Sequence, residues 1–217
     1  IIESMPSVLM ELGRFAESLP SLRHPHFLYA VCHGELLTAE QRNYIQDMFG
    51  CEVYNRYGLQ EMQDIAIECA RHNGFHVFEE SFIVEVLDAA GNPLPPGVRG
   101  RIVVTHFHND AMPFIRYDTG DLGLIMTGIC SCGIPSKRIF VEGRSGIFLE
   151  LNGKKFNHLE FDHILRYFSG SVFQYQLVKK SENRVELRIV PCGKFGERDS
   201  KELLNQFRKK VGFVPKL

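Results

Sequence analysis

Three cysteines and one histidine in this sequence have the side-chain types that bind zinc. They are Cys69, His76 and the pair Cys130 and Cys132. Thiolate sulfur and imidazole nitrogen are the ligand set of tetrahedral zinc, and three sulfurs with one nitrogen form a closed structural site. The Cys-x-Cys spacing of the pair is tighter than the usual two-residue spacing, so spacing alone does not establish the site.

Two alternatives to this zinc site remain open. His72 is a rival fourth ligand, because it would lie one turn from Cys69 if that segment were helical. Asn73-Gly74 indicates a turn instead, which favours His76. The other alternative is three reduced cysteines in loops and a histidine at a strand edge.

Three further segments carry residues suited to nucleotide chemistry. They are Tyr57-Gly-Leu-Gln-Glu61, Ile115-Arg-Tyr-Asp-Thr-Gly-Asp121 and Gly143-Arg144. Each one alone is common, but their order and spacing together resemble the adenylate-forming superfamily over nearly the whole chain. The resemblance is to the phenylacetate-CoA ligase branch in particular. Some members of that branch share the metal-ligand pattern, matched here by Glu68-Cys69, Gly74-Phe-His76 and Cys130-Ser-Cys-Gly133.

The resemblance implies that Tyr57 offers an aromatic face to adenine, while Gly34 lets backbone approach the other side of the base. Glu61 would be a magnesium ligand, since Mg²⁺ prefers hard oxygen and bridges phosphate oxygens. The alternatives are a tyrosine packed under a turn and a charge at the start of the next helix.

Asp121 would accept hydrogen bonds from the ribose hydroxyls, as acidic residues do in dinucleotide sites. Arg144 would contact the nucleotide as a small domain closes, with a plain surface arginine as the alternative. A structural zinc would order the loop carrying Cys130 close to Asp121.

The chain also departs from the family pattern. Gln60 stands where threonine is usual before the magnesium-binding glutamate, although an amide can still donate to phosphate. Gly146 replaces a common hinge aspartate. The family's phosphate loop would precede Ile1 and its catalytic lysine would follow Leu217, so we expect a fragment that binds nucleotide weakly and does not turn over.

The elements that must position these residues begin with a parallel α/β unit. Apolar spacing predicts a helix from Val8 to Leu19, with Ser7 as its cap and Pro20 as its stop. Short strands are predicted at 26–31 and 51–54, around a helix that begins with the Thr38/Gln41 capping box and ends at Gly50. Ligand sites in such sheets follow the strands, which is where Gly34-Glu35 and Tyr57-Gly58 are expected.

The pattern changes from Phe75 onward. An antiparallel pair at 82–87 and 101–107 is predicted, followed by a short strand at 114–117. After Gly143 we expect a small α+β unit with a helix near 158–168, strands at 173–179 and 184–190, and a helix at 200–211. The predicted fold is α/β with an antiparallel β extension in residues 1–143, then a small α+β C-terminal domain in residues 144–217.

Composition bounds the function. The 217 residues carry 25 basic and 26 acidic side chains, which argues against a nucleic-acid partner. No long apolar stretch or signal peptide is present, so we expect a cytoplasmic protein with no membrane partner and no disulfide framework.

For the full-length protein the resemblance implies ATP-dependent activation of a carboxylic acid and transfer to CoA, with ATP/AMP, Mg²⁺ and structural zinc at its sites. A homodimer is left open. Two rival hypotheses are a degenerate binding module, favoured by Gln60 and Gly146, and a zinc-ribbon interaction protein supported only by the cysteine cluster.

Overall fold

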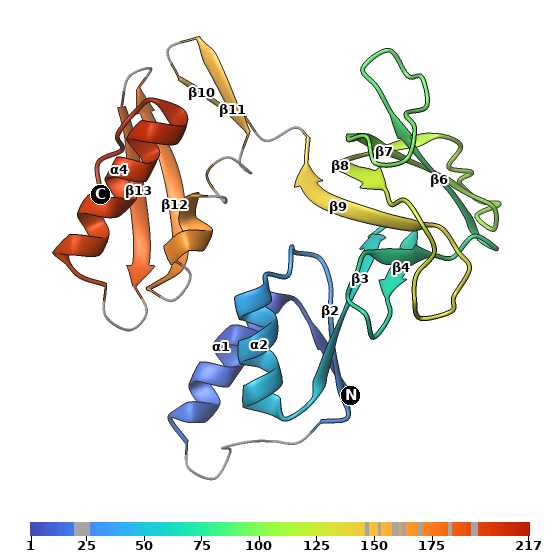
Figure 1. Cartoon of the computed structure of the whole chain (residues 1–217), viewed down its shortest axis with the longest axis horizontal. Helices are drawn as coiled ribbons and strands as arrows, with labels where there is room; N and C mark the ends of the chain where they lie inside the picture. The colour runs from blue at the N-terminus through green and yellow to red at the C-terminus, as the bar shows by residue number, and fades with distance from the viewer. Residues whose placement is uncertain are drawn as a thin grey trace. The chain divides into compact units, whose positions relative to one another are not determined.

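The computed structural model describes residues 1–19, 27–145, 148–151, 153–157, 161, 164–168, 171–181, 184–191 and 195–217 (Figure 1). The chain divides into two compact units, residues 1–145 and 146–217. The boundary predicted at Gly143-Arg144 falls at the end of strand β9 (Arg138–Arg144), close to this division. The two units are described separately below.

The first unit begins with a parallel α/β segment. Strands β1 (Ile2–Ser4), β2 (Tyr29–Cys32) and β3 (Glu52–Leu59) pair in parallel, and helices α1 (Pro6–Glu17) and α2 (Ala39–Phe49) connect them. Both helices lie against the strands and bury their apolar sides in one core (Figure 1). The predicted strand, helix, strand unit is therefore confirmed.

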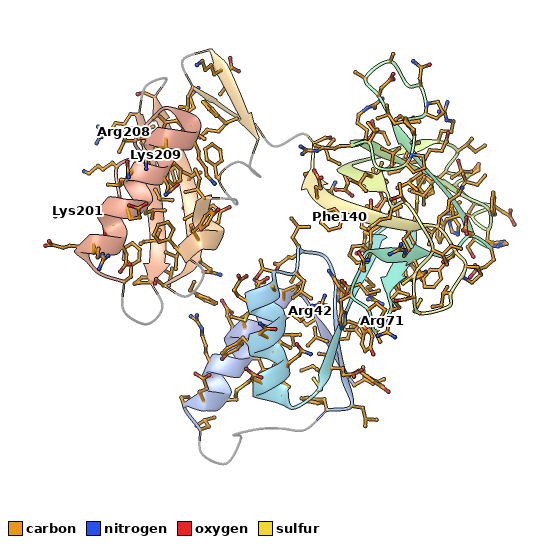
Figure 2. The ribbon with its side chains drawn as sticks, in the orientation of Figure 1. Arg42, Arg71, Phe140, Lys201, Arg208 and Lys209 are labelled. Carbon is orange, nitrogen blue, oxygen red and sulfur yellow. The ribbon has the colours of Figure 1, made fainter. Side chains whose placement is uncertain are left out.

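Helix α2 begins as the sequence predicts. The Gln41 amide donates to Thr38 Oγ1 at 3.1 Å, and the Thr38 amide donates to Gln41 Oε1 at 3.0 Å, which is a capping box. Gly50 ends the helix in the left-handed conformation. Arg42, labelled in Figure 2, reaches from α2 to the carboxylate of Glu68, with N–O distances of 2.9 and 2.7 Å.

Helix α1 begins earlier than predicted. It starts at Pro6, with Met5 as its cap and no side-chain capping bond. The prediction that Ser7 caps the helix is wrong, because proline suits the first helical position and Ser7 donates to Glu35 instead. Pro20 lies outside the described residues.

Strand β3 is longer than predicted, and it is where the sheet changes direction. Its first half pairs in parallel with β2, and its second half pairs in antiparallel fashion with β4 (Gln63–Glu68). Alternate residues Val53, Asn55, Tyr57 and Leu59 are buried, as expected of a strand with one covered face. Tyr57-Gly58 therefore lies within β3, and its predicted place after the strand is wrong.

Antiparallel strands complete the sheet. They are β5 (Phe75–Val77), β6 (Phe82–Leu87), β7 (Gly100–His106), β8 (Tyr117–Ile125) and β9, and the sheet order is β1-β2-β3-β4-β5-β9-β8-β7-β6. The predicted β6–β7 pair is confirmed. A core that includes Ile65, Ile102 and Ile139 lies on this part of the sheet.

The prediction of a strand at 114–117 is wrong. Arg116 has a φ of +50°, which is incompatible with extended backbone, so β8 begins only at Tyr117 and continues to Ile125. This places Asp121 inside a strand.

The second unit has its own small α+β core. Hairpin β10 (Phe148–Leu151) and β11 (Lys154–Asn157) was not predicted, whereas β12 (Val172–Ser181), β13 (Arg184–Pro191) and α4 (Glu197–Val211) match predicted elements. Phe161, Ile164 and Leu165 are helical, and the 3-10 helix Arg166–Phe168 follows. Lys201, Arg208 and Lys209 on α4 are labelled in Figure 2.

The predicted fold class is thus confirmed: an α/β segment with an antiparallel extension, followed by a small α+β unit. Among the described residues, every helix is too short or too polar to cross a membrane. Gly146 lies outside those residues.

Candidate functional site

Asp121 lies in a bulge of strand β8. Arg101 and Val103 of β7 pair with Leu122 and Asp118, so three residues of β8 oppose one residue of β7. Gly120 at the centre has a φ of +73°, a conformation that favours glycine. Bulges bend a strand and re-aim its side chains, and this one determines where Asp121 points.

The Asp121 carboxylate is buried and has two partners. Tyr57 donates its hydroxyl to Oδ2 at 2.7 Å, and Arg144 Nε lies 3.2 Å from Oδ1. Burial raises the pKa of Asp121, while the Tyr57 hydrogen bond and the Arg144 charge lower it. Each carboxylate oxygen has two lone pairs, so both can still accept from a ligand.

Tyr57 is only 8% exposed, and its ring lies 6.4 Å from that of Phe75. Burial raises the pKa of its phenol. The predicted stacking of this ring on adenine stays a prediction, and its hydroxyl already has a second role at Asp121.

Arg144 connects the bulge to the end of β9. It pairs with Asp121 in the β8–β9 register, and its Nη1 donates to the Thr119 carbonyl at 3.2 Å. Its side chain is 57% exposed. Arg144 can therefore turn towards a bound anion without leaving a buried cation unpaired.

Glu61 follows β3 and is exposed. Tyr117 at the start of β8 donates its hydroxyl to Glu61 Oε1 at 2.6 Å. This hydrogen bond is the main cause that lowers the pKa of Glu61, so the carboxylate is ionised and fits a magnesium ligand.

The remaining predicted residues have structural partners. Gly34 follows β2 with a φ of +76°. Glu35 accepts from the Ser7 amide at 3.0 Å and its hydroxyl at 2.7 Å, which anchors the start of α1. A side chain at Gly58 would meet the Gln63 carbonyl at 2.2 Å, so glycine is needed for the β3–β4 contact. Gln60 is exposed beside Glu61.

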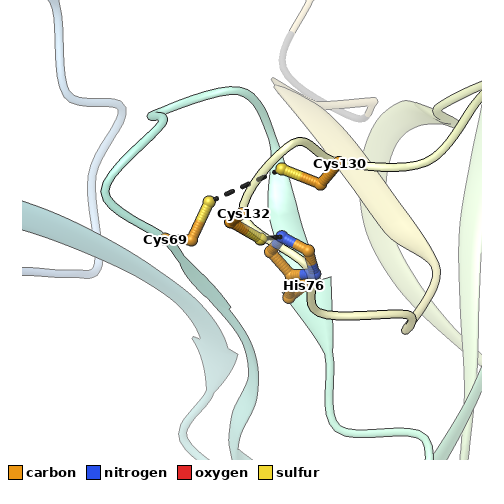
Figure 3. Close-up of side chains that lie close together, drawn as sticks. All are labelled: Cys69, His76, Cys130 and Cys132. Carbon is orange, nitrogen blue, oxygen red and sulfur yellow. Dashed lines mark hydrogen bonds between the residues drawn. The ribbon is translucent and has the colours of Figure 1, made fainter.

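The four predicted metal ligands converge (Figure 3). Their ligand atoms all lie within 4.8 Å of one another. The sulfurs of Cys69 and Cys130 are 3.7 Å apart, and Cys132 Sγ lies 3.4 Å from His76 Nε2. Ligands of tetrahedral zinc with bonds of about 2.3 Å to sulfur are separated by about 3.8 Å. The residues therefore fit zinc, and the sulfur separation is far too long for a disulfide.

The surroundings of this cluster also suit a metal. His76 is buried on β5, and its Nδ1 lies 3.1 Å from Ser136 Oγ, which orients the ring. The backbone amide of Cys132 is the main cause that lowers the pKa of Cys130 to about 6, which favours the thiolate. His72 instead faces Arg42 and Glu68, so the structure favours His76 over this rival.

The metal cluster is not close to Asp121, contrary to the sequence-based expectation. β5 pairs with β9 at Arg138, whereas Asp121 pairs with Arg144 at the other end of that strand. Six residues of strand span about 20 Å. The cluster lies at the loop between β8 and β9 rather than at the end of β9 that pairs with Asp121.

Sequence reasoning missed Tyr117 and Thr119. Thr119 donates to the Ile102 carbonyl at 2.9 Å and accepts from the Asp121 amide at 3.1 Å, so it holds the bulge. A usable signal was present for Tyr117: it lies four residues before Asp121, as Tyr57 lies four residues before Glu61.

Comparison of the whole chain with solved structures identifies the fold. The chain superposes on 2-hydroxyisobutyryl-CoA ligase in complex with R3-HIB-AMP with a TM-score of 0.80 and 21% identity, covering 99% of this chain and 49% of that one. A benzoate CoA ligase from Burkholderia xenovorans gives a TM-score of 0.63 and 16% identity over 98% and 45%. This is the fold of the adenylate-forming CoA ligases.

Sequence comparison is more specific. The phenylacetate-coenzyme A ligase of Thermus thermophilus is 31% identical over 185 residues, which is 82% of this chain and 42% of that enzyme. The Pseudomonas putida phenylacetate-coenzyme A ligase is 33% identical over 125 residues, 55% of this chain and 28% of that one. No family model matches the chain. The chain is thus a homologue of phenylacetate-coenzyme A ligase and spans less than half of that enzyme's length.

Proposed function

We propose that the full-length protein containing this chain is an acid–thiol ligase that activates a carboxylic acid with ATP and transfers the acyl group to CoA. The observation that carries the proposal is the buried Asp121 carboxylate, held by Tyr57 and Arg144 in a fold shared with ligases bound to acyl-adenylates. Homology to phenylacetate-coenzyme A ligase supports it. An aryl acid is the first substrate class to test.

The proposed reaction has two steps. In the first, a carboxylate oxygen of the acid attacks the α-phosphorus of ATP, and pyrophosphate leaves with the electrons of the broken P–O bond. In the second, the CoA thiolate attacks the acyl carbon, and AMP leaves carrying the oxygen that came from the acid. No redox partner is required.

Each charged residue has a proposed role in this scheme. Asp121 accepts from the ribose hydroxyls and Arg144 donates to ribose or phosphate, which fixes the α-phosphate relative to the acid. Glu61 would hold magnesium, and magnesium supplies neutralisation of charge on the phosphates. Gln60, beside it, can donate an amide hydrogen to a phosphate oxygen.

We also propose that Cys69, His76, Cys130 and Cys132 hold a structural zinc ion. The donor set and the separations of 3.7 and 3.4 Å support zinc, and a site of four protein ligands leaves no open position for a substrate. The ion would order the β8–β9 connection and take no part in the ligase chemistry.

The ligase proposal is tested by pyrophosphate release from ATP with the full-length protein, across aryl and aliphatic acids, with and without CoA. We expect acid-dependent release that Asp121→Ala lowers by at least about a hundredfold, as removal of a key polar contact does. Asp47→Ala, which removes an exposed carboxylate on α2, is the matched control and should retain activity. Folded protein that releases no pyrophosphate with any acid would favour the binding-module hypothesis.

A further inference from the structure

The two proposed ligand carboxylates each accept a hydrogen bond from a tyrosine of the other motif. Tyr117, four residues before Asp121, donates to Glu61 at 2.6 Å. Tyr57, four residues before Glu61, donates to Asp121 at 2.7 Å. The first bond joins residues that are 56 positions apart in the sequence, and the second joins residues that are 64 positions apart. Both bonds are therefore tertiary contacts.

These hydrogen bonds require a curved sheet. Strands β3 and β8 are separated in the sheet by β4, β5 and β9. Four strand spacings in a flat sheet would separate β3 from β8 by about 19 Å, which is beyond the reach of a tyrosine and a carboxylate. The two phenol–carboxylate bonds therefore lie across a concave face and hold the two motifs at a fixed separation.

The geometry of both bonds is that of a strong contact. Hydroxyl–carboxylate bonds of this length are charge-assisted. The Tyr117 ring packs edge-on against Phe114 with centroids 5.1 Å apart, and the Tyr57 ring is buried, so neither hydroxyl moves freely. Glu61 is exposed, and without a partner its side chain would sample several rotamers.

We propose that Tyr57 and Tyr117 are a reciprocal pair of positioning residues: Tyr117 orients Glu61 for magnesium, and Tyr57 orients Asp121 for ribose. The inference rests on the proposed function. It assigns to Tyr57 a role for its hydroxyl that is separate from stacking, and it adds Tyr117 to the site. Because magnesium demands near-octahedral geometry, a fixed Glu61 carboxylate binds it better than a mobile one.

Equilibrium binding of nucleotides to the full-length protein tests the pair. The first readout is the gain in ATP affinity on adding Mg²⁺, measured by titration calorimetry. The second is the affinity ratio of AMP to 2′-deoxy-AMP. Tyr117→Phe and Tyr57→Phe each remove one hydroxyl and keep the ring. Tyr54→Phe is the matched control, because the Tyr54 hydroxyl donates to Glu52 at 2.6 Å and to neither of the two proposed ligand carboxylates.

The two variants should lose different properties. Tyr117→Phe should reduce the Mg²⁺-dependent gain in ATP affinity by about tenfold and leave the AMP to 2′-deoxy-AMP ratio unchanged. Tyr57→Phe should reduce that ratio by about tenfold and leave the Mg²⁺ effect unchanged. Tyr54→Phe should change neither.

Three results would count against part of this account. Wild-type protein that binds neither MgATP nor AMP would overturn the proposed function itself. Wild-type binding with both variants behaving like Tyr54→Phe would overturn only the positioning roles. Equal loss of both readouts in each variant would also overturn them, because a general structural role predicts that result. If Tyr57→Phe unfolds, the Tyr117→Phe measurement alone decides, since Tyr117 is only partly buried.

Discussion

At the scale of single residues, Asp121 shows how a residue proposed to bind a ligand can reduce stability. A buried carboxylate loses hydration, and here burial outweighs the Tyr57 hydrogen bond and the Arg144 charge, so the pKa is raised. The folded protein therefore favours protonated Asp121 more than the unfolded chain does. Ionised Asp121, the form proposed to bind ribose, is retained at a cost in folding free energy.

Replacing Asp121 with asparagine should stabilise the protein at neutral pH. Because the folded pKa is raised, the stability from the protonated form is fully present below the unfolded value of 3.8 and is lost as pH rises through the folded pKa. Relative to wild type, the thermal midpoint of Asp121→Asn should therefore increase as pH rises from about 4 through the folded pKa of Asp121.

Asp88 offers a control of opposite sign. It accepts from the amides of Ala90 and Asn92, and the Asn92 amide is the main cause that lowers its pKa. Its stabilisation is present above the unfolded pKa and lost as pH falls, so Asp88→Asn should lower the midpoint at pH 7 and have less effect in acid. Parallel pH curves for the two variants would contradict this account.

At the same scale, the sequence predicted residue types better than contacts. Cysteine and histidine indicate a candidate metal site by their chemistry, and the four predicted ligands do converge. The tyrosine hydroxyls were not predicted, because their acceptors lie in the other motif and become neighbours only through the curvature of the sheet.

At the scale of elements, local signals decided what could be predicted. The capping box and Gly50 predicted the start and the end of α2 correctly, since both signals act within a few residues. β3 was predicted too short because Asn55 and Arg56 interrupt its apolar pattern, although Asn55 is buried by tertiary contacts. The start of β8 was predicted too early because Phe114 begins an apolar run. Arg116, which follows that run, has a positive φ that no local sequence pattern indicates.

Removing the α2 cap tests the element that follows Gly34 and Glu35. Thr38→Ala should reduce the stability of α2 by about 1 kcal/mol, because the Gln41 amide loses its acceptor. Amide hydrogen exchange in residues 39–49 should then be about fivefold faster where it occurs by local opening. Thr38→Ser, which keeps the hydroxyl, should exchange at nearly the wild-type rate; equal effects of both variants would exclude the cap as the cause.

At the scale of the whole molecule, the chain consists of two units with separate apolar cores. The proposed zinc ligands all belong to the first unit, where Cys69 and His76 flank one loop and the pair Cys130 and Cys132 lies in another. Zinc would therefore connect two loops of one unit and leave the other unit unaffected.

Removal of the metal tests whether zinc acts on the first unit alone. Protein purified without added metal should hold about one zinc per chain, and Cys130→Ser should lose it. Chelation should speed hydrogen exchange in residues 69–76 and 126–137 and leave β12, β13 and α4 unchanged. Cys51→Ser, outside the cluster, should keep its zinc. The metal site would be contradicted if the purified protein contained no zinc and its hydrogen exchange were the same with and without chelator.

The central claim, attack of a carboxylate on the α-phosphorus of ATP, is tested most directly by oxygen transfer. The full-length protein is supplied with ATP, CoA and an acid labelled with ¹⁸O in both carboxylate oxygens, and the AMP is analysed by mass spectrometry. The account predicts AMP that carries one ¹⁸O from the acid, together with unlabelled pyrophosphate. Thioester formed with unlabelled AMP, or with label in inorganic phosphate, would contradict it.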